Sequence, residues 1–182
     1  ALGSRTLCNN TCGASNVAIG YNTLSTSVTA ASNVGIGDHA LFKTNAPDNV
    51  GIGRDALRCN RAGCENVAVG RCALYRNTNG VGSVGVGLCA LMCTTANSNT
   101  AIGKVAGQCI TSGILNTAVG VAALKGHDTT VTGSENTAVG YFAGGRISTS
   151  TANTAIGSRA LCGLSTSSYN TAVGYNSQLT RS

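Results

Sequence analysis

Nine cysteines are the residues of this 182-residue chain best suited to chemistry, because thiolates bind soft metals and pair as disulfides. They are Cys8, Cys12, Cys59, Cys64, Cys72, Cys89, Cys93, Cys109 and Cys162. No two have the Cys-x-x-Cys spacing of a zinc site, and neither His39 nor His127 adjoins a cysteine pair. We therefore expect no metal site. An odd number of cysteines leaves at least one free thiol.

Two other patterns imitate active sites. The segments at 35–40 and 85–90 match the Gly-x-Gly-x-x-Gly/Ala dinucleotide fingerprint, but related strings recur throughout the chain and no helix-forming stretch follows them. The two histidines and six acidic residues lie in variable turn-like segments, and we expect His39 and His127 to be exposed. The sequence therefore predicts no catalytic residue, no cofactor and no enzymatic activity.

The composition excludes several classes of protein. Aromatic residues are 4% and charged residues 10% of the chain, so neither a thick aromatic core nor a charged disordered chain fits. No apolar run approaches the ~20 residues that cross a bilayer, so we expect no membrane insertion. The net charge of +6 arises from scattered cations without interleaved aromatics, which argues against nucleic-acid binding.

One short repeat accounts for the whole chain. The segment 16–20, Asn-Val-Ala-Ile-Gly, recurs at a nearly constant spacing of about 17 residues, with a single longer step around 126–128 that indicates a loop insertion. Its first position is Ser83 in one unit and otherwise Asn16, Asn33, Asn49, Asn66, Asn99, Asn116, Asn136, Asn153 and Asn170. Its fifth position is always glycine: Gly20, Gly37, Gly53, Gly70, Gly87, Gly103, Gly120, Gly140, Gly157 and Gly174. Residues 1–182 are therefore predicted to be a single repeat array.

Each unit contains one strand-like segment. Positions 2 and 4 are Val, Ile or Thr and share one face, whereas positions 1, 3 and 5 are Asn, Ala or Gly and share the other. The length of the unit suits one coil of a parallel β-solenoid with two short strands and two turns. We therefore expect an all-β rod of about ten coils, roughly 50 Å long, in which both faces of the strand are covered.

This stacking places some cysteines next to each other. Cys72 and Cys89 occupy the same unit position in adjacent coils, and so do Cys93 and Cys109. At a spacing of ~4.8 Å each pair lies within reach of a disulfide, although such a bond could be strained. The favoured interpretation is that the cysteines are small hydrophobic residues replacing Ala or Ser, and structural disulfides are the alternative.

Three acids that precede a unit, Asp48, Glu65 and Glu135, are expected to be solvated near cations of neighbouring coils.

The strings Asn-Thr-Ala-Val-Gly-Tyr at 136–141 and 170–175, with Asn-Val-Ala-Ile-Gly-Tyr at 16–21, resemble repeats of bacteriophage and large-virus tail fibres. They are also similar to the Ser-Val-Ala-Ile-Gly repeats in the heads of YadA-like trimeric autotransporter adhesins, whose usual unit is shorter, near fourteen residues. The resemblance implies a left-handed parallel β-roll and a homotrimer, with one face of each coil inside its own roll and another against the partner chains. The chain starts and stops within a unit, and we expect it to be a fragment of a longer fibre.

The expected function is structural: a segment of a trimeric viral or phage fibre or spike, on the virion surface or extracellular, that supports attachment to a host. The host receptor or glycan would be bound by parts outside this segment. Frequent cysteines favour a fibre assembled in reducing cytosol over the alternative of a bacterial adhesin head exported through an oxidising compartment. A further alternative is a monomeric solenoid that binds a repetitive surface such as ice or a polysaccharide, suggested by Thr at position 2 from Thr100 to Thr171.

Overall fold

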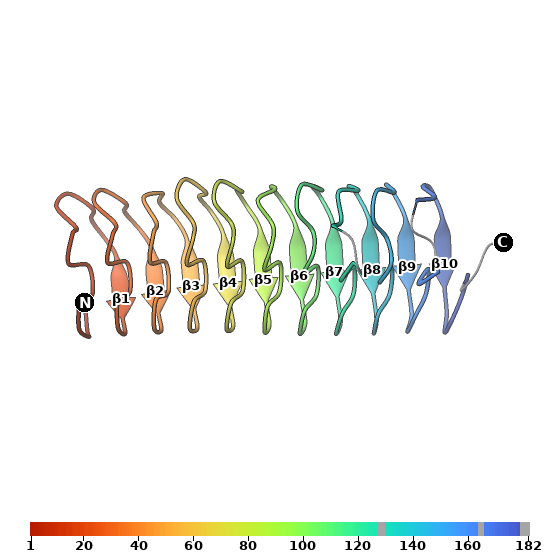
Figure 1. The fold of residues 1–182 in the computed structure, drawn as a ribbon, viewed down its shortest axis with the longest axis horizontal. Coiled ribbons are helices and arrows are strands. Elements are labelled where there is room, and N and C mark those ends of the chain that lie inside the picture. The colour runs from red at the N-terminus through yellow and green to blue at the C-terminus, as the bar shows by residue number, and fades with distance from the viewer. Residues whose placement is uncertain (127–129, 164–165, 179–182) are drawn as a thin grey trace.

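Ten short strands, one from each repeat unit, lie side by side along the computed structural model (Figure 1). The structure describes residues 1–126, 130–163 and 166–178. The strands are β1 (Val17–Ile19), β2 (Val34–Ile36), β3 (Val50–Ile52), β4 (Val67–Val69), β5 (Val84–Val86), β6 (Thr100–Ile102), β7 (Thr117–Val119), β8 (Thr137–Val139), β9 (Thr154–Ile156) and β10 (Thr171–Val173). The first residues and β10 lie at opposite ends of the rod.

The strands form one parallel sheet in which each strand pairs with the next one along the chain. The register is that of the repeat, so Val17 lies opposite Val34 and Thr117 opposite Thr137. Backbone hydrogen bonds consequently run along the rod axis, as from Val17 N–H to the Asn33 carbonyl at 2.8 Å. The predicted all-β solenoid is confirmed. The described part of the chain contains no helix, and so none that could cross a membrane.

Among the described residues the second half of a coil contains no strand, so the prediction of two strands per coil was wrong. The inward leucine at unit position 9 has a positive φ in most coils, for example 52° at Leu41 and 51° at Leu57. A left-handed residue cannot continue an extended segment. The coils are nevertheless bonded to each other here, because the Leu41 N–H donates to the Ala56 carbonyl at 2.9 Å. We call this segment, unit positions 8–13, the return leg.

The core is a narrow column of leucine and alanine. Leu24, Leu41, Leu57, Leu74 and Leu91 stack from coil to coil with no exposed surface, and the alanines at unit positions 3 and 8 pack around them. Such small layers agree with a chain that has few aromatic residues. Because every layer contacts only the coils above and below it, the stability of each coil depends on its neighbours.

The first residues continue the array below β1. Leu2 forms a parallel bridge with Ile19, and Gly3 has the φ of 132° that is typical of the fifth unit position. Residues 1–3 therefore occupy the place of the end of a repeat unit, as the sequence predicted. Most of the expected loop insertion at 126–128 lies outside the described residues.

Candidate functional site: the outward face of the strands

The strands turn their β-branched side chains outward. Unit position 3, the middle residue of each strand, is buried in all ten strands. Unit positions 2 and 4, the first and last residues of each strand, are half-buried or exposed. The outward side chains are Val or Ile except for threonine at position 2 of β6 to β10. We call this surface, positions 2 and 4 of β1–β10, the outer strand face. Ile102 is 44% exposed and Ile156 is 41% exposed, so in the single chain this apolar face is open.

The interior has no room for the β-branched side chains. A Cβ added at Gly51 would lie 3.0 Å from Leu41 Cγ, and a Cβ added at Gly35 would lie 2.7 Å from Thr23 Cγ2. Position 3 must therefore be Gly or Ala wherever the leucine column passes behind it. Since successive side chains of a strand point to opposite faces, positions 2 and 4 are directed away from the core.

The two borders of the outer strand face differ in chemistry. Position 6 carries exposed tyrosine in three coils, Tyr21, Tyr141 and Tyr175. Asp48 and Glu135 lie on the other border, one residue before an Asn, and are exposed as expected, as is Glu65. The expected ion pairs of these three acids are not found: in the part of the chain that the structure describes, the acidic partners are Asp38 and Asp55.

The first unit position forms a ladder of buried amides inside each coil. Asn116 N–H donates to Asn99 Oδ1 at 3.0 Å, and the Asn116 amide nitrogen donates to the Gly133 carbonyl, also at 3.0 Å. Asn136 N–H in turn donates to Asn116 Oδ1 at 3.0 Å. The ladder thus satisfies polar groups of the turns that precede the strands.

Ser83 interrupts this ladder. Its hydroxyl is 3.3 Å from both the Ala96 carbonyl and the Asn99 N–H, whereas the corresponding bond from the Asn116 N–H to Asn99 Oδ1 is 3.0 Å long. The unit thus keeps the connection between coils with a shorter side chain and fewer hydrogen bonds.

The cysteines are free thiols. Cys72 and Cys89, which occupy the same unit position in adjacent coils, lie within hydrogen-bond reach of each other. Burial raises the pKa of the Cys89 thiol, and the charge and hydrogen bond of the neighbouring Cys72 raise it further. Burial likewise raises the pKa of Cys109, with a smaller contribution from Cys93. All four side chains are half-buried. At neutral pH Cys89 and Cys109 are therefore poor nucleophiles, in agreement with the interpretation of cysteine as a small hydrophobic residue.

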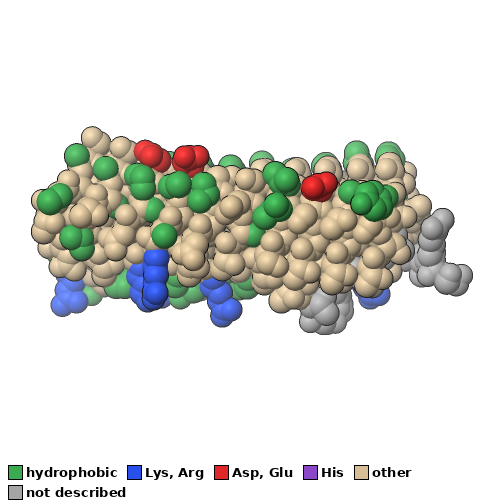
Figure 2. All heavy atoms as spheres, turned by 90° about the horizontal axis from the view of Figure 1, so that it is seen from above, with side chains coloured by type: hydrophobic (Ala, Val, Ile, Leu, Met, Phe, Trp, Pro, Cys, Tyr) green, Lys and Arg blue, Asp and Glu red, His purple; other side chains and the backbone are tan. Residues whose placement is uncertain are grey.

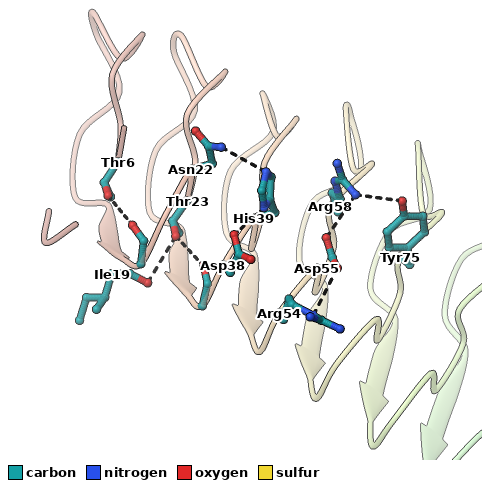
Figure 3. Close-up of polar contacts among 12 residues, drawn as sticks. Thr6, Ile19, Asn22, Thr23, Asp38, His39, Arg54, Asp55, Arg58 and Tyr75 are labelled. Carbon is teal, nitrogen blue, oxygen red and sulfur yellow. Dashed lines mark hydrogen bonds and ion pairs between the residues drawn. The ribbon is translucent and has the colours of Figure 1, made fainter. Parts of the chain in front are cut away.

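A set of polar contacts links neighbouring coils near the N-terminal end of the rod (Figure 3). His39 was predicted to be exposed, but only 24% of its side chain is, because Asp38, the Asn22 amide and the Tyr21 and Phe42 rings surround it. Arg58 contacts the Asp55 carboxylate at 3.3 Å and the Tyr75 hydroxyl at 3.3 Å in the next coil. The Asn22–His39 and Arg58–Tyr75 contacts join neighbouring coils, whereas the contacts of Asp38 and Asp55 lie within one coil. His127 lies outside the described residues.

The described residues include no group of three His, Cys, Asp or Glu side chains that could hold a metal ion. The outer strand face is an apolar surface whose chemistry suits contact with another apolar surface. Comparison of the chain with protein-family models, with curated proteins and with solved structures found no match.

Proposed function

We propose that this chain is a structural segment of a trimeric fibre or spike, in which three left-handed rolls pack in register with their outer strand faces toward a common axis. The single observation that carries the proposal is the open outer strand face. Over nine inter-strand steps of ~4.8 Å it extends about 43 Å. A continuous apolar stripe bordered by polar residues is typical of a protein contact surface.

The filled interior of the coil supports a partner that is another copy of the same chain. The interior is already filled by leucine and alanine, so the chain cannot cover its own valines and isoleucines by rearranging. Parallel chains in register present the same face at every level, and a rotation axis repeats one interface until the assembly closes. A contact of this kind is large and apolar, as obligate interfaces are.

The free thiols support assembly in a reducing compartment. Four of the nine cysteines occupy matching unit positions in adjacent coils, and their oxidation would compete with ordinary folding. We therefore place the proposed fibre on a virion, made in cytosol before release, with attachment to a host as its role. A bacterial adhesin head remains the alternative fibre.

Molar mass tests the proposal. Size-exclusion chromatography with light scattering should give three times the chain mass of 18.1 kDa. A stable folded monomer or dimer would overturn the trimer.

Two adjacent substitutions separate assembly from folding. Val119→Arg places a charge on the outer strand face and should yield a folded monomer, because the side chain points away from the core. Ala118→Arg places the same charge at a position with no exposed surface and should abolish the fold itself. Circular dichroism measures folding and light scattering measures assembly.

Gln108→Arg is the matched control. It adds the same charge on the return leg at unit position 10, which Arg58 and Lys125 already occupy in other coils. It should leave the mass at that of the trimer. Trimers of Val119→Arg, or monomers of Gln108→Arg, would contradict the proposed interface.

One observation favours a second function, a monomeric solenoid that binds a repetitive surface. Thr100, Thr117, Thr137, Thr154 and Thr171 form a column on the outer strand face of β6–β10. The valines that continue this column in β1–β5 make the ladder incomplete. A monomer that inhibits ice recrystallisation and loses that activity in Thr117→Val would establish this alternative in place of the fibre.

A further inference from the structure

The return leg carries a groove of about 460 Å³ along the rod axis. Lys43, Arg61 and Arg76 line it together with Cys59, Cys93 and three threonines. The three cationic side chains are exposed and the two thiols are half-buried. The groove therefore offers ammonium and guanidinium donors over a partly apolar floor, and threonine hydroxyls whose oxygens can accept, since those of Thr95 and Thr111 already donate to backbone carbonyls.

The repeat assembles this groove from residues far apart in the sequence. Counted from the Asn of each unit, Lys43 and Arg76 occupy position 11 and Arg61 occupies position 13 of three consecutive coils. Adjacent coils are ~4.8 Å apart, so the three charges lie within about 10 Å along the axis. That distance is about one Debye length at physiological ionic strength, so their fields add. Cations that are scattered in the sequence thus form one site.

The charges of the groove are not neutralised by nearby acids. No acidic side chain lines it, and the ion pairs formed by the described residues involve Arg54, Arg58 and His39 instead. On the face shown in Figure 2, the visible Lys and Arg side chains lie along one long edge of the rod and the visible Asp and Glu side chains lie near the opposite edge. This separation leaves a positive potential along the return leg.

We propose that the groove binds a linear anionic polysaccharide, with sulfate or carboxylate groups of successive sugars on the three cations. Arginine and lysine donate charge-assisted hydrogen bonds to such groups, and threonine hydroxyls bond to sugar hydroxyls. The aliphatic stems and thiols of the lining are suited to the apolar edges of sugar rings. Nucleic acid fits less well, because no aromatic side chain lines the groove to stack on a base.

This site is independent of the trimer. It lies on the return leg, whereas the proposed interface is the outer strand face, so a monomer would bind as well. A fibre with this property would contact a host glycan along its shaft and not only through its end.

The first experiment measures binding of a fluorescent heparin octasaccharide to the full chain by anisotropy. Arg61→Gln and Arg76→Gln should each weaken binding about tenfold, the loss expected for one charge-assisted hydrogen bond. Affinity should also fall steeply between about 50 and 200 mM salt. Circular dichroism verifies that each variant is folded.

Arg146→Gln is the matched control. It removes the same charge as Arg76→Gln at the same unit position, and Arg146 is also exposed and lies outside the groove. Binding within twofold of the original chain supports the groove, whereas equal losses in all three variants would show a response to net charge alone and overturn it.

The second experiment uses the thiols as internal reporters. Bound octasaccharide should slow alkylation of Cys59 and Cys93 by iodoacetamide, as read by mass spectrometry, and leave the exposed Cys8 and Cys12 unchanged. Uniform protection, or none, would overturn the site. An unsulfated polyuronate of equal charge distinguishes carboxylate from sulfate recognition, and binding to either supports the proposal. Tighter binding of single-stranded DNA of equal charge would overturn the polysaccharide assignment.

Discussion

Glycine at the fifth unit position is required for two separate physical reasons. At Gly120 φ is 126°, a backbone conformation that side chains disfavour. A Cβ added there would also lie 2.6 Å from the Gly140 carbonyl oxygen of the next coil. The glycine column thus lets adjacent coils approach each other as closely as parallel strands require.

Replacing Gly120 with valine should lower the free energy of unfolding by about 2 kcal/mol or more, because backbone strain and backbone contact both oppose the side chain. Thermal and chemical denaturation measure the loss. Gly82→Ser is the control, since φ there is 65° and the nearest atom to an added Cβ is Ser98 Oγ at 3.9 Å. Serine occupies this unit position elsewhere, so its effect should stay below ~1 kcal/mol. Equal losses in both variants would show that the close approach is unimportant.

Restoring the amide ladder should stabilise the chain. Ser83→Asn adds an amide that can reach Asn66 Oδ1 and the Ala96 carbonyl, as Asn33 reaches Asn16 Oδ1 and the Ala46 carbonyl at 3.4 and 3.0 Å. The units that begin at 33 and 83 have the same length, so the surroundings correspond. We expect a gain of about 1 kcal/mol in chemical denaturation. A loss of stability would indicate that the space at Ser83 is too small for an amide.

At the scale of the element, the large apolar side chain of the return leg lies at unit position 9 in some coils and at unit position 12 in others. Unit position 9 is leucine in most coils but glycine at Gly107 and Gly144, and there isoleucine stands three residues later, at Ile110 and Ile147. A Cβ added at Gly107 would lie 3.0 Å from Ile110 Cδ1. Ile110 and Ile147 are almost wholly buried, so they fill the space that leucine occupies in other coils.

This exchange predicts strong coupling between the two sites. Gly107→Leu alone should cost about 1 to 3 kcal/mol by overpacking against Leu91 and Ile110. Adding Ile110→Thr should recover part of the loss, because threonine occupies that unit position at Thr44 and Thr94. A double-mutant cycle in denaturant should give a coupling of about 0.5 to 3 kcal/mol. If the stability changes of Gly107→Leu and Ile110→Thr were additive, the two side chains would not compete for the same space.

At the scale of the whole molecule, the rod is a one-dimensional stack in which contacts join only neighbouring coils. Its length is thus set by the number of units, and the same faces continue from one end to the other. Both proposed surfaces, the outer strand face and the groove, arise from this repetition.

Removal of one whole unit should therefore be tolerated. Deleting residues 50–66 joins Asn49 to Val67 and brings β4 against β2 in the register that β3 had. The shortened chain should remain β-rich and unfold cooperatively, with a melting temperature lower by a few degrees. Deleting only residues 50–57 removes β3 and leaves a remnant too short to form a coil, so it should interrupt the stack and lower the β content far more than the whole-unit deletion. If circular dichroism found both products equally folded, the register would not control the fold.

The repeat alone determined much of this molecule. Ten recurrences at a nearly constant spacing predict a parallel solenoid, and alternation along a strand divides each unit into a β-branched face and a small-residue face. Glycine at position 5 and asparagine at position 1 identify the columns that stack. These features follow from local sequence because each coil repeats the environment of the one before it.

Only the tertiary structure decided which face is inside. Alternation separates Ala118 from Val119 but does not direct either one to the core, and apolar content alone would place valine there. The leucine column of the return leg fills the interior, so only alanine or glycine fits opposite it and the β-branched residues face outward. The groove depended on tertiary structure for a related reason: Lys43, Arg61 and Arg76 become neighbours only when successive coils are stacked about 4.8 Å apart.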